Sequence, residues 1–452
     1  MENTTSLRKS IAERMAYRYG RGQRVDRDAR KGRSHMAFIS GTRVLDLTDE
    51  RGLMTGRILA DLGADVVHVE APNGSPARSA QPTAAGREAS FLWEAYAANK
   101  RSVALDLAVP GDAARMRALI EAADILIESS GPVAMRREGL DWSDVRQINP
   151  RLIYVSMTGF GRTGPKAGYA ESDLILWAAG GPLEPHRDGS RPPVRPSIPQ
   201  AHRLAAADAA AGALLALIAR RTTGRGQLVD VAVQAALGSA TLATVLAAAV
   251  GDVPRAIGAG QELTHRVDRS GSGSGTPAAS KKWECVDGMI EFHVGIGPAA
   301  GAFTGNFFQW MLAEGEPVQK YTELDWRTVD KLIESGEFPD AEIDRVRATV
   351  RDFLATKTKD QVLRAAVQYK LLCVPIFTTA DLAATEQLEA RHTFVPVGDG
   401  ERTLRLVGMP AAVNVDAFTL TRRAPKIGEH TDSAIRDWST APSGAQEEAV
   451  LA

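Results

Sequence analysis

The chain has 452 residues, of which 44% are hydrophobic and 24% charged, as expected for a globular protein of two or three domain-sized units. Its net charge of −1 gives no overall field that would favour nucleic acid or an anionic membrane as a partner. The two cysteines, Cys285 and Cys373, form no C-x-x-C pattern, which excludes a disulfide scaffold and a zinc ribbon and favours a cytoplasmic location.

The N-terminal segment differs from the rest of the chain. Residues 1–36 contain ten Lys or Arg and four Asp or Glu, a net charge of +6, with little apolar periodicity. We expect a basic, disordered tail over 1–38, the alternative being an arm for nucleic acid or membrane, and a second disordered tail over 441–452. The ordered pattern starts directly after Met36, a second candidate for the true start, and the lack of an apolar h-region argues against secretion.

From residue 39 to 236, short β-branched runs alternate with helical stretches. The strands are expected at 42–48, 64–70, 100–107, 124–129, 151–161 and 227–233. The main helices are expected at 52–63, at Asp112–Ala123 and in a long alanine-rich stretch directly after His202. Strands that alternate with helices of ten or more residues predict a large Rossmann-like α/β domain with a parallel sheet.

The pattern changes after the large domain. The alanine-rich run Ala235–Val250 is too short and too weakly apolar for a membrane span, so we expect a buried helix there, within a linker over 237–261. Residues 262–385 predict a small α+β domain, with a Ser/Gly-rich loop, a hairpin that turns at Asp287-Gly288 and helices over Ala341–Ala355 and Thr358–Tyr369. Residues 386–440 predict strand and loop that return to the large domain.

Several functional motifs are absent or incomplete. The G-x-G-x-x-G match at 159–164 follows a strand but runs into Pro165 rather than a helix, so the glycines are expected to shape a loop near a ligand. The eight histidines show no H-x-H or H-E-x-x-H spacing, and no G-x-S-x-G elbow occurs, so we expect no metal site and no hydrolase triad. The acids in "LDLTDE" suit paired catalytic carboxylates or a solvated turn equally well.

Basic residues gather near predicted strand ends, at Lys100-Arg101, Arg136-Arg137 and Lys166. In an open α/β sheet, ligands bind outside the carboxyl ends of the strands, and arginine suits phosphate groups. A phosphate-binding crevice and a solvated positive loop explain these positions about equally well.

Six segments in this order resemble the class III CoA-transferases, the family that includes formyl-CoA transferase, carnitine CoA-transferase and the related α-methylacyl-CoA racemase. They are "VLDLTDERG…ILADLGADVVHVEAPNG", "NKRSVALDL", "ADILIESSGP", "INPRLIYVSMTGFGRTGP", "ALIARRTTGRGQLVDVAV" and "RAPKIGEHT". The resemblance implies a Rossmann-like large domain and a small domain, with two chains interlocked like links. It also implies coenzyme A or an acyl-CoA as substrate, an organic acid as the second substrate and no permanently bound cofactor.

The same motifs imply where coenzyme A would bind. Leu105, Asp106 and Leu107 would lie near the adenine, and Ser129, Gly131 and Arg137 near the phosphates and pantetheine. The Ser/Gly loop at 270–275 is similar to the glycine loop that covers the active site in some members of the family.

One position departs from the family. In the transferases, an aspartate lies 21 residues before the threonine of T-G-R-G-Q; here that threonine is Thr223, and position 202 holds His202. The family aspartate becomes first a mixed anhydride and then a CoA thioester, and an imidazole cannot form that thioester. Asp208, almost two helical turns further on, cannot simply replace it.

Three hypotheses follow. In the first, the chain is one subunit of a hetero-oligomeric CoA-transferase whose partner, a second family III chain, supplies the aspartate, as "LDLTDERG" and "PQA" resemble the branch of the two-subunit benzylsuccinate CoA-transferase. In the second, a self-sufficient homodimer uses a displaced carboxylate, with Asp173 as candidate, or uses His202 as a base in a CoA-thioester isomerase or lyase. In the third, the chain binds acyl-CoA without catalysis. We expect no nucleic-acid or membrane partner.

Overall fold

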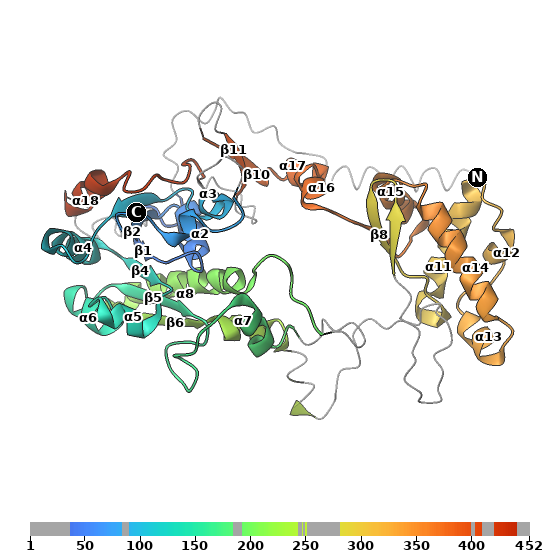
Figure 1. Cartoon of the computed structure of the whole chain (residues 1–452), viewed down its shortest axis with the longest axis horizontal. Coiled ribbons are helices and arrows are strands. Elements are labelled where there is room, and N and C mark those ends of the chain that lie inside the picture. The colour runs from blue at the N-terminus through green and yellow to red at the C-terminus, as the bar shows by residue number, and fades with distance from the viewer. Residues whose placement is uncertain are drawn as a thin grey trace.

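The computed structural model describes residues 37–83, 90–183, 192–242, 246, 249–250, 281–398, 403–408 and 420–440. These form a larger lobe and a smaller lobe, joined by the segments that run between them (Figure 1). The Ser/Gly loop and the expected tails, except residues 37 and 38, lie outside the described residues, and the proposed domain boundaries stay predictions.

A six-stranded parallel sheet forms the centre of the larger lobe, in the order β3-β2-β1-β4-β5-β6. Its strands are β1 (Arg43–Leu47), β2 (Asp65–Glu70), β3 (Arg101–Ala104), β4 (Ile125–Glu128), β5 (Ile153–Thr158) and β6 (Leu228–Ala232). All six expected strands are confirmed. The strand order reverses between β1 and β4, so the sheet has a topological switch point there, the usual place of a ligand crevice in such folds.

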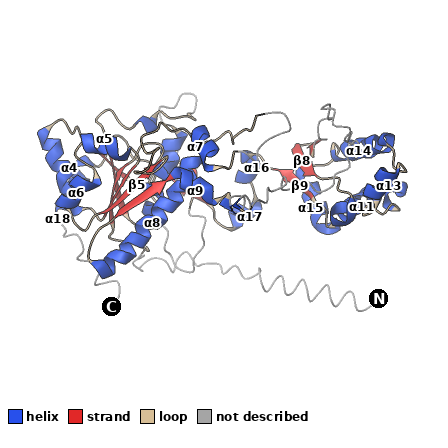
Figure 2. Cartoon of the chain, turned by 90° about the horizontal axis from the view of Figure 1, so that it is seen from below, coloured by secondary structure: helices blue, strands red, loops and turns tan. Residues whose placement is uncertain are grey.

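Helices cover both faces of this sheet (Figure 2). Alternate strand residues point to opposite faces, so Val44 packs into one core and Leu45 into the other. The first core is covered by α2 (Leu53–Asp61), α7 (Asp173–Gly180), α8 (Ala201–Thr223) and α9 (Val233–Ser239), and the second by α4 (Pro110–Ala122), α6 (Trp142–Ile148) and α18 (Thr431–Thr440). Short elements complete the lobe: η2 (Pro76–Arg78), α3 (Phe91–Tyr96) and α5 (Gly131–Arg137).

The long helix α8 is confirmed, and small side chains bring it close to the sheet. Its alanines at positions 205, 206, 209, 210 and 213 are at most 2% exposed, and a Cβ on Gly212 would lie 2.7 Å from Val229 Cγ1 in β6. Gly224 ends the helix in the left-handed conformation. Among the described residues, α8 alone is long and apolar enough to cross a membrane, yet its alanine face packs on the sheet, as in a core helix.

The smaller lobe has an antiparallel sheet of β7 (Lys282–Cys285), β8 (Gly288–Phe292) and β9 (Cys373–Ile376). Helices α11 (Gly297–Ala313), α12 (Gln319–Thr322), α13 (Val329–Ser335), α14 (Asp340–Leu354) and α15 (Lys359–Tyr369) pack beside it around an aromatic core. The predicted hairpin and the last two helices are confirmed. The hairpin pairs Cys285 with Gly288, which places its turn at Val286-Asp287, one residue earlier than predicted.

The chain returns to the larger lobe through α16 (Thr379–Ala383), α17 (Glu386–Ala390) and the antiparallel pair β10 (Phe394–Val397) and β11 (Leu404–Val407). The sequence predicted strand and loop here, and the structure adds α18, which packs on α4. The predicted burial of the run Ala235–Val250 is wrong in its second half: Leu242 and Leu246 are helical but 56% and 60% exposed, and Val250 is 81% exposed. Apolar composition alone does not show which residues of a helix have other side chains to pack against.

Candidate functional site

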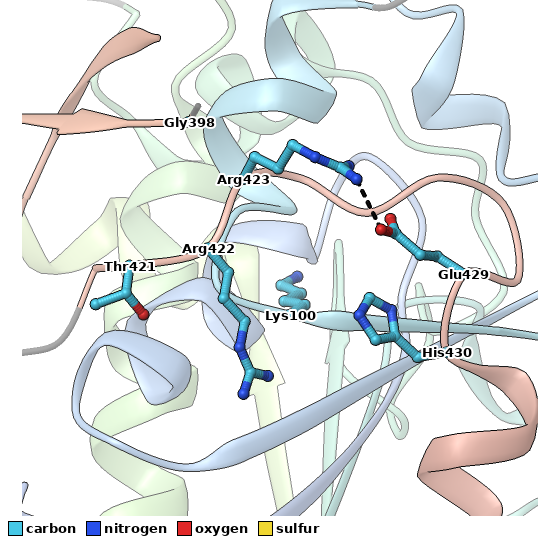
Figure 3. A pocket seen from close by; sticks show the side chains of 7 residues that line it. All are labelled: Lys100, Gly398, Thr421, Arg422, Arg423, Glu429 and His430. Carbon is cyan, nitrogen blue, oxygen red and sulfur yellow. Dashed lines mark hydrogen bonds and ion pairs between the residues drawn. The ribbon is translucent and has the colours of Figure 1, made fainter. Parts of the chain in front are cut away.

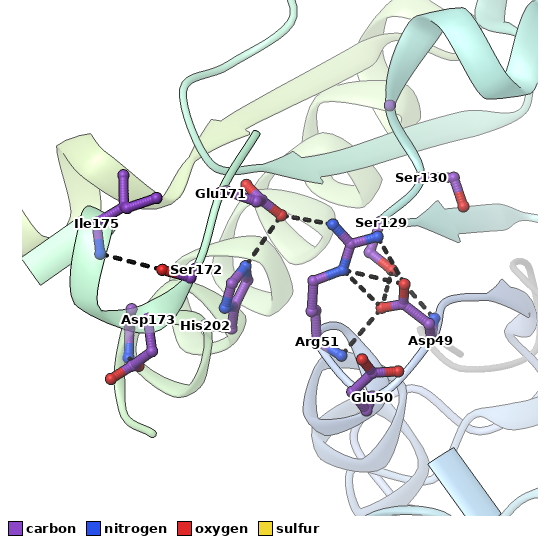
Figure 4. A network of polar contacts seen from close by, with 12 residues as sticks. Asp49, Glu50, Arg51, Ser129, Ser130, Glu171, Ser172, Asp173, Ile175 and His202 are labelled. Atoms are coloured by element: carbon purple, nitrogen blue, oxygen red, sulfur yellow. Dashed lines mark hydrogen bonds and ion pairs between the residues drawn. The ribbon is translucent and has the colours of Figure 1, made fainter. Parts of the chain in front are cut away.

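Four chain segments meet at the switch point of the large sheet (Figure 4). Asp49 and Arg51 follow β1, and Ser129 follows β4. Glu171 belongs to the connection between β5 and α7, and His202 lies in the first turn of α8. Hydrogen bonds and ion pairs join these five side chains into one network, which we call the crevice network.

His202 lies inside α8, whereas the sequence placed it just before the helix. The helix begins at Ala201 because Asp173 Oδ1 accepts the backbone N–H groups of Gln200 and Ala201, both at 2.8 Å. This cap comes from α7 rather than from the residue before the helix, so the local sequence does not reveal it. The His202 side chain is 11% exposed, and its Nε2 lies 3.3 Å from Glu171 Oε1.

Glu171 is held between two basic side chains. Its Oε1 also accepts a hydrogen bond from Arg51 Nη1 at 2.5 Å. Burial by itself would raise the pKa of Glu171, but the contacts with His202 and Arg51 outweigh it and lower this pKa below its usual value. The other carboxyl oxygen lies over Gly159 at the end of β5, where a Cβ would overlap it. Glu171 is therefore an ionised carboxylate whose charge is balanced by its basic neighbours, and its side chain packs closely against Gly159.

Arg51 is fixed from its other side by Asp49. Its Nε lies 3.0 Å from both carboxyl oxygens of Asp49, and its Nη2 lies 2.6 Å from Oδ2. Asp49 Oδ1 accepts the Ser129 hydroxyl at 2.9 Å, which connects the ends of β1 and β4. Burial raises the pKa of Asp49, but its bonds with Arg51 and Ser129 lower it overall. The side chains of Arg51 and Asp49 remain 31% and 27% exposed, so solvent reaches this part of the network.

Asp173, the displaced carboxylate considered from the sequence, has a structural role in the described structure. Its Oδ1 is taken by the two backbone N–H groups at the start of α8, and its Oδ2 lies 3.4 Å from Arg195 Nη1. Glu171, not Asp173, is the carboxylate in contact with His202. The sequence analysis did not single out Glu171 or Arg51. Arg51 lies in the quoted segment "LDLTDERG", but the roles of both residues depend on contacts between segments that are distant in the sequence.

The residues expected near the adenine follow β3. Leu105 is buried, whereas Asp106 is exposed and its Oδ1 accepts the Ala108 N–H at 3.0 Å. Leu107 is half-buried. With strands spaced about 4.8 Å apart, the ends of β3 and β4 are separated by roughly 14 Å along the sheet edge. An elongated ligand is needed to contact both ends.

The residues expected near the phosphates and pantetheine follow β4. Ser129 is buried in the crevice network, and the Gly131 N–H donates to Glu128 Oε2 at 2.7 Å. Gly131 has a φ of +79°, which suits glycine. The Arg137 side chain is 79% exposed and pairs with the neighbouring Glu138. These six coenzyme A contacts stay predictions.

Neither alternative considered for Lys100 and Arg101, a phosphate-binding crevice or a solvated positive loop, holds in the structure. Lys100 is fully buried and its Nζ donates to Asp46 Oδ2 and the Leu53 carbonyl, both at 2.7 Å. Arg101 forms ion pairs with Asp65 and Asp437. Lys100 directly precedes β3 and Arg101 is its first residue, so both lie at the opposite end of the strand from the carboxyl edge.

A hollow lies beside β3 (Figure 3). Its volume is about 300 Å³, and it is lined by Lys100, Gly398, Thr421, Arg422, Arg423, Glu429 and His430. Arg423 pairs with Glu429 at 2.7 Å, and burial lowers the pKa of His430. Much of the charge in this hollow is therefore already compensated. Within the described ranges no cluster of three or more His, Cys, Asp or Glu could hold a metal ion.

Comparison with known proteins gives one consistent result. The sequence model of CoA-transferase family III matches residues 39–431. The chain is 33% identical over 406 residues to succinyl-CoA:(R)-benzylsuccinate CoA-transferase subunit BbsE of Thauera aromatica, covering 87% of this chain and 92% of that protein. It is 28% identical over 402 residues to formyl-CoA:oxalate CoA-transferase of Streptomyces coelicolor, covering 87% and 93%.

A solved structure shows the same fold. The crystal structure of a CAIB/BAIF family protein from Brucella suis superimposes with a TM-score of 0.70 at 24% identity, covering 90% of this chain and all of that one. The predicted fold class, a Rossmann-like α/β domain with a smaller α+β domain, is confirmed.

Proposed function

The chain belongs to CoA-transferase family III, and from that premise we propose that it is one subunit of a CoA-transferase whose nucleophilic aspartate lies on a second chain. One observation carries the proposal. The start of α8, where the transferases have their aspartate, holds His202, and both carboxylates of the crevice network are engaged in ion pairs.

The chemistry needs a free carboxylate. In the transfer, a carboxylate oxygen attacks the thioester carbon, the C–S bond breaks and CoA thiolate leaves. The thiolate then attacks the enzyme carbonyl of the anhydride and releases the donor acid, which leaves CoA on the enzyme until the acceptor acid takes it by the reverse steps. Glu171 is a poor candidate for this attack, because the reaction would remove its charge from between Arg51 and His202.

The names of the relatives suggest the substrates and the assembly. BbsE is named as a subunit of an enzyme that uses succinyl-CoA and benzylsuccinate, and the other relative uses oxalate. Succinate, benzylsuccinate and oxalate each carry two carboxylates. We therefore propose succinyl-CoA or a similar acyl-CoA as donor and a dicarboxylic acid of the benzylsuccinate type as acceptor. We also propose an interlocked assembly of this chain with a second family III chain in the cytoplasm.

A second candidate function is a self-sufficient transferase that uses Glu171. The observation in its favour is the 3.3 Å contact between Glu171 Oε1 and His202 Nε2, which places a carboxylate beside the family's nucleophile position. In this case the homodimer alone would carry out the complete transfer.

Turnover of succinyl-CoA by the purified chain, alone and after addition of a second family III chain that has the aspartate, tests the proposal. We expect no transfer by this chain alone and transfer by the mixture. In the mixture, His202→Ala should keep kcat within about tenfold, since His202 forms no covalent intermediate. A homodimer that transfers CoA without the second chain would contradict the proposal.

A further inference from the structure

Resting on the proposed function, we propose that Arg51 and His202 form a binding subsite for the second carboxylate of a dicarboxylic substrate. In the structure, the carboxylate of Glu171 occupies this subsite as an internal stand-in.

The two donors converge on one oxygen atom. Arg51 Nη1 lies 2.5 Å and His202 Nε2 3.3 Å from Glu171 Oε1 (Figure 4). Asp49 holds the guanidinium through Nε and Nη2, and Ser129 holds Asp49, so Nη1 is directed at Glu171 without any ligand present. A fixed arginine beside a polarised imidazole is a strong arrangement for binding a carboxylate.

Glu171 is easier to displace than the residues that hold it. It belongs to the connection 159–172, which has neither helix nor strand. Arg51, in contrast, is bound by Asp49, which is tied to the end of β4. Rotation of the Glu171 side chain to another staggered rotamer would vacate the place of Oε1, and the substrate carboxylate would replace the ion pairs that this rotation breaks.

The hydrogen bonds offered by Arg51 and His202 favour replacement of Glu171 by ligands that carry a carboxylate. A substrate carboxylate that replaces the Glu171 carboxylate restores the same hydrogen bonds to Arg51 and His202. A methyl group cannot replace these hydrogen bonds, so a monoacid leaves Glu171 in place and gains no contact with Arg51 or His202. The subsite should therefore favour a diacid over the monoacid of equal length.

Succinate and butyrate, which differ by a carboxylate in place of a methyl group, are the test pair. Calorimetric titration of the full-length chain with each acid gives a direct binding constant. We expect succinate to bind at least tenfold more tightly than butyrate, about 1.4 kcal/mol. Equal binding of the two acids would overturn the proposal.

Two variants separate the subsite from general charge attraction. Glu171→Gln weakens the stand-in and should tighten succinate binding about tenfold, a gain that misfolding cannot produce. Arg51→Gln should remove the preference for succinate. Arg195→Gln is the matched control, because the Arg195 side chain is 32% exposed against 31% for Arg51 and also pairs with a carboxylate. Loss of the preference in the control but not in Arg51→Gln would contradict the subsite.

Failure of the subsite and failure of the proposed function can be told apart. Binding of the acids is measured without turnover and without coenzyme A, whereas the turnover experiment locates the nucleophile. A chain that prefers succinate but transfers CoA on its own would keep the subsite and reject the division between two chains.

Discussion

Two charged networks include acids that lie three residues apart, Asp46 inside strand β1 and Asp49 just after it. The two networks differ in burial. In the first, Asp46 Oδ2 and Lys100 Nζ lie 2.7 Å apart with both side chains 0% exposed. In the second, the crevice network, Arg51 and Asp49 keep about three tenths of their side chains exposed. The first network lies in the core and the second at the switch point of the sheet.

The difference shows that burial, more than charge, decides what an ion network can do. Asp46 also accepts the N–H and the hydroxyl of Thr48, so its oxygens are satisfied by the protein itself. Burial raises the pKa of Asp46, but Lys100 and His68 outweigh it and hold this pKa well below its usual value. Nothing from solvent can exchange with this pair, whereas a ligand can reach Arg51. The buried Asp46–Lys100 network, here called the sealed network, supports the fold, whereas the crevice network is suited to binding.

Removing the buried Lys100 cation should have the largest effect on stability. Lys100→Met leaves the Asp46 carboxylate buried without its main partner, and we expect the free energy of unfolding to fall by about 3–5 kcal/mol. Urea denaturation at pH 7 measures this loss. Arg115→Gln, which breaks the exposed pair with Asp112 on α4, is the control and should change stability by less than about 0.5 kcal/mol.

The double variant Asp46→Asn with Lys100→Met sharpens the same prediction. Because it removes both charges, it should recover part of the loss seen in Lys100→Met. Losses that simply add would show that the two side chains are not coupled, and the sealed network would then have no role as a pair.

Gly159→Ala should have an intermediate effect on stability, confined to the crevice network. The new methyl group would overlap Glu171 Oε2, so the Glu171 side chain must move. We expect a loss of about 1–2 kcal/mol in the free energy of unfolding together with tighter succinate binding, because the stand-in is pushed aside. Gly168→Ala is the control from the same connection, since a Cβ there meets nothing within 4 Å. Equal behaviour of the two variants would contradict the close fit of Glu171.

The smallest expected effect is a pH-dependent one. Because the folded pKa of Glu171 is lowered, its ion pairs stabilise the protein above the ordinary value of 4.5 and lose this effect as the pH falls through the lowered pKa. Glu171→Gln should therefore cost about 1 kcal/mol at pH 7 and progressively less below pH 4.5. Urea denaturation of both proteins at several pH values measures the difference, and a difference that grows on acidification would contradict the assignment.

Much of the fold follows from local sequence. The six strands and helices α14 and α15 have clear periodicity, so their positions were predicted to within a few residues. Errors occurred where tertiary contacts decide. The start of α8 depends on Asp173 from α7, and the burial of Leu242 and Val250 depends on a partner that the described structure does not provide.

The candidate site shows the same limit. His202 could be singled out because its distance from T-G-R-G-Q is fixed along one helix. Glu171 could not, since it reaches His202 from a loop 31 residues away. The acids of "LDLTDE" were noticed, yet the role of Asp49 depends on Arg51 and on Ser129 from another strand.

Mapping the enzyme-bound thioester tests the division between two chains most directly. The chain is incubated with succinyl-CoA, alone and with the second family III chain, and quenched with borohydride, which reduces an acyl thioester on a carboxylate side chain to an alcohol. Intact mass and peptide mapping then locate the change. We predict that it occurs only on the aspartate of the added chain. Reduction at Glu171, or at any carboxylate of this chain alone, would contradict the account.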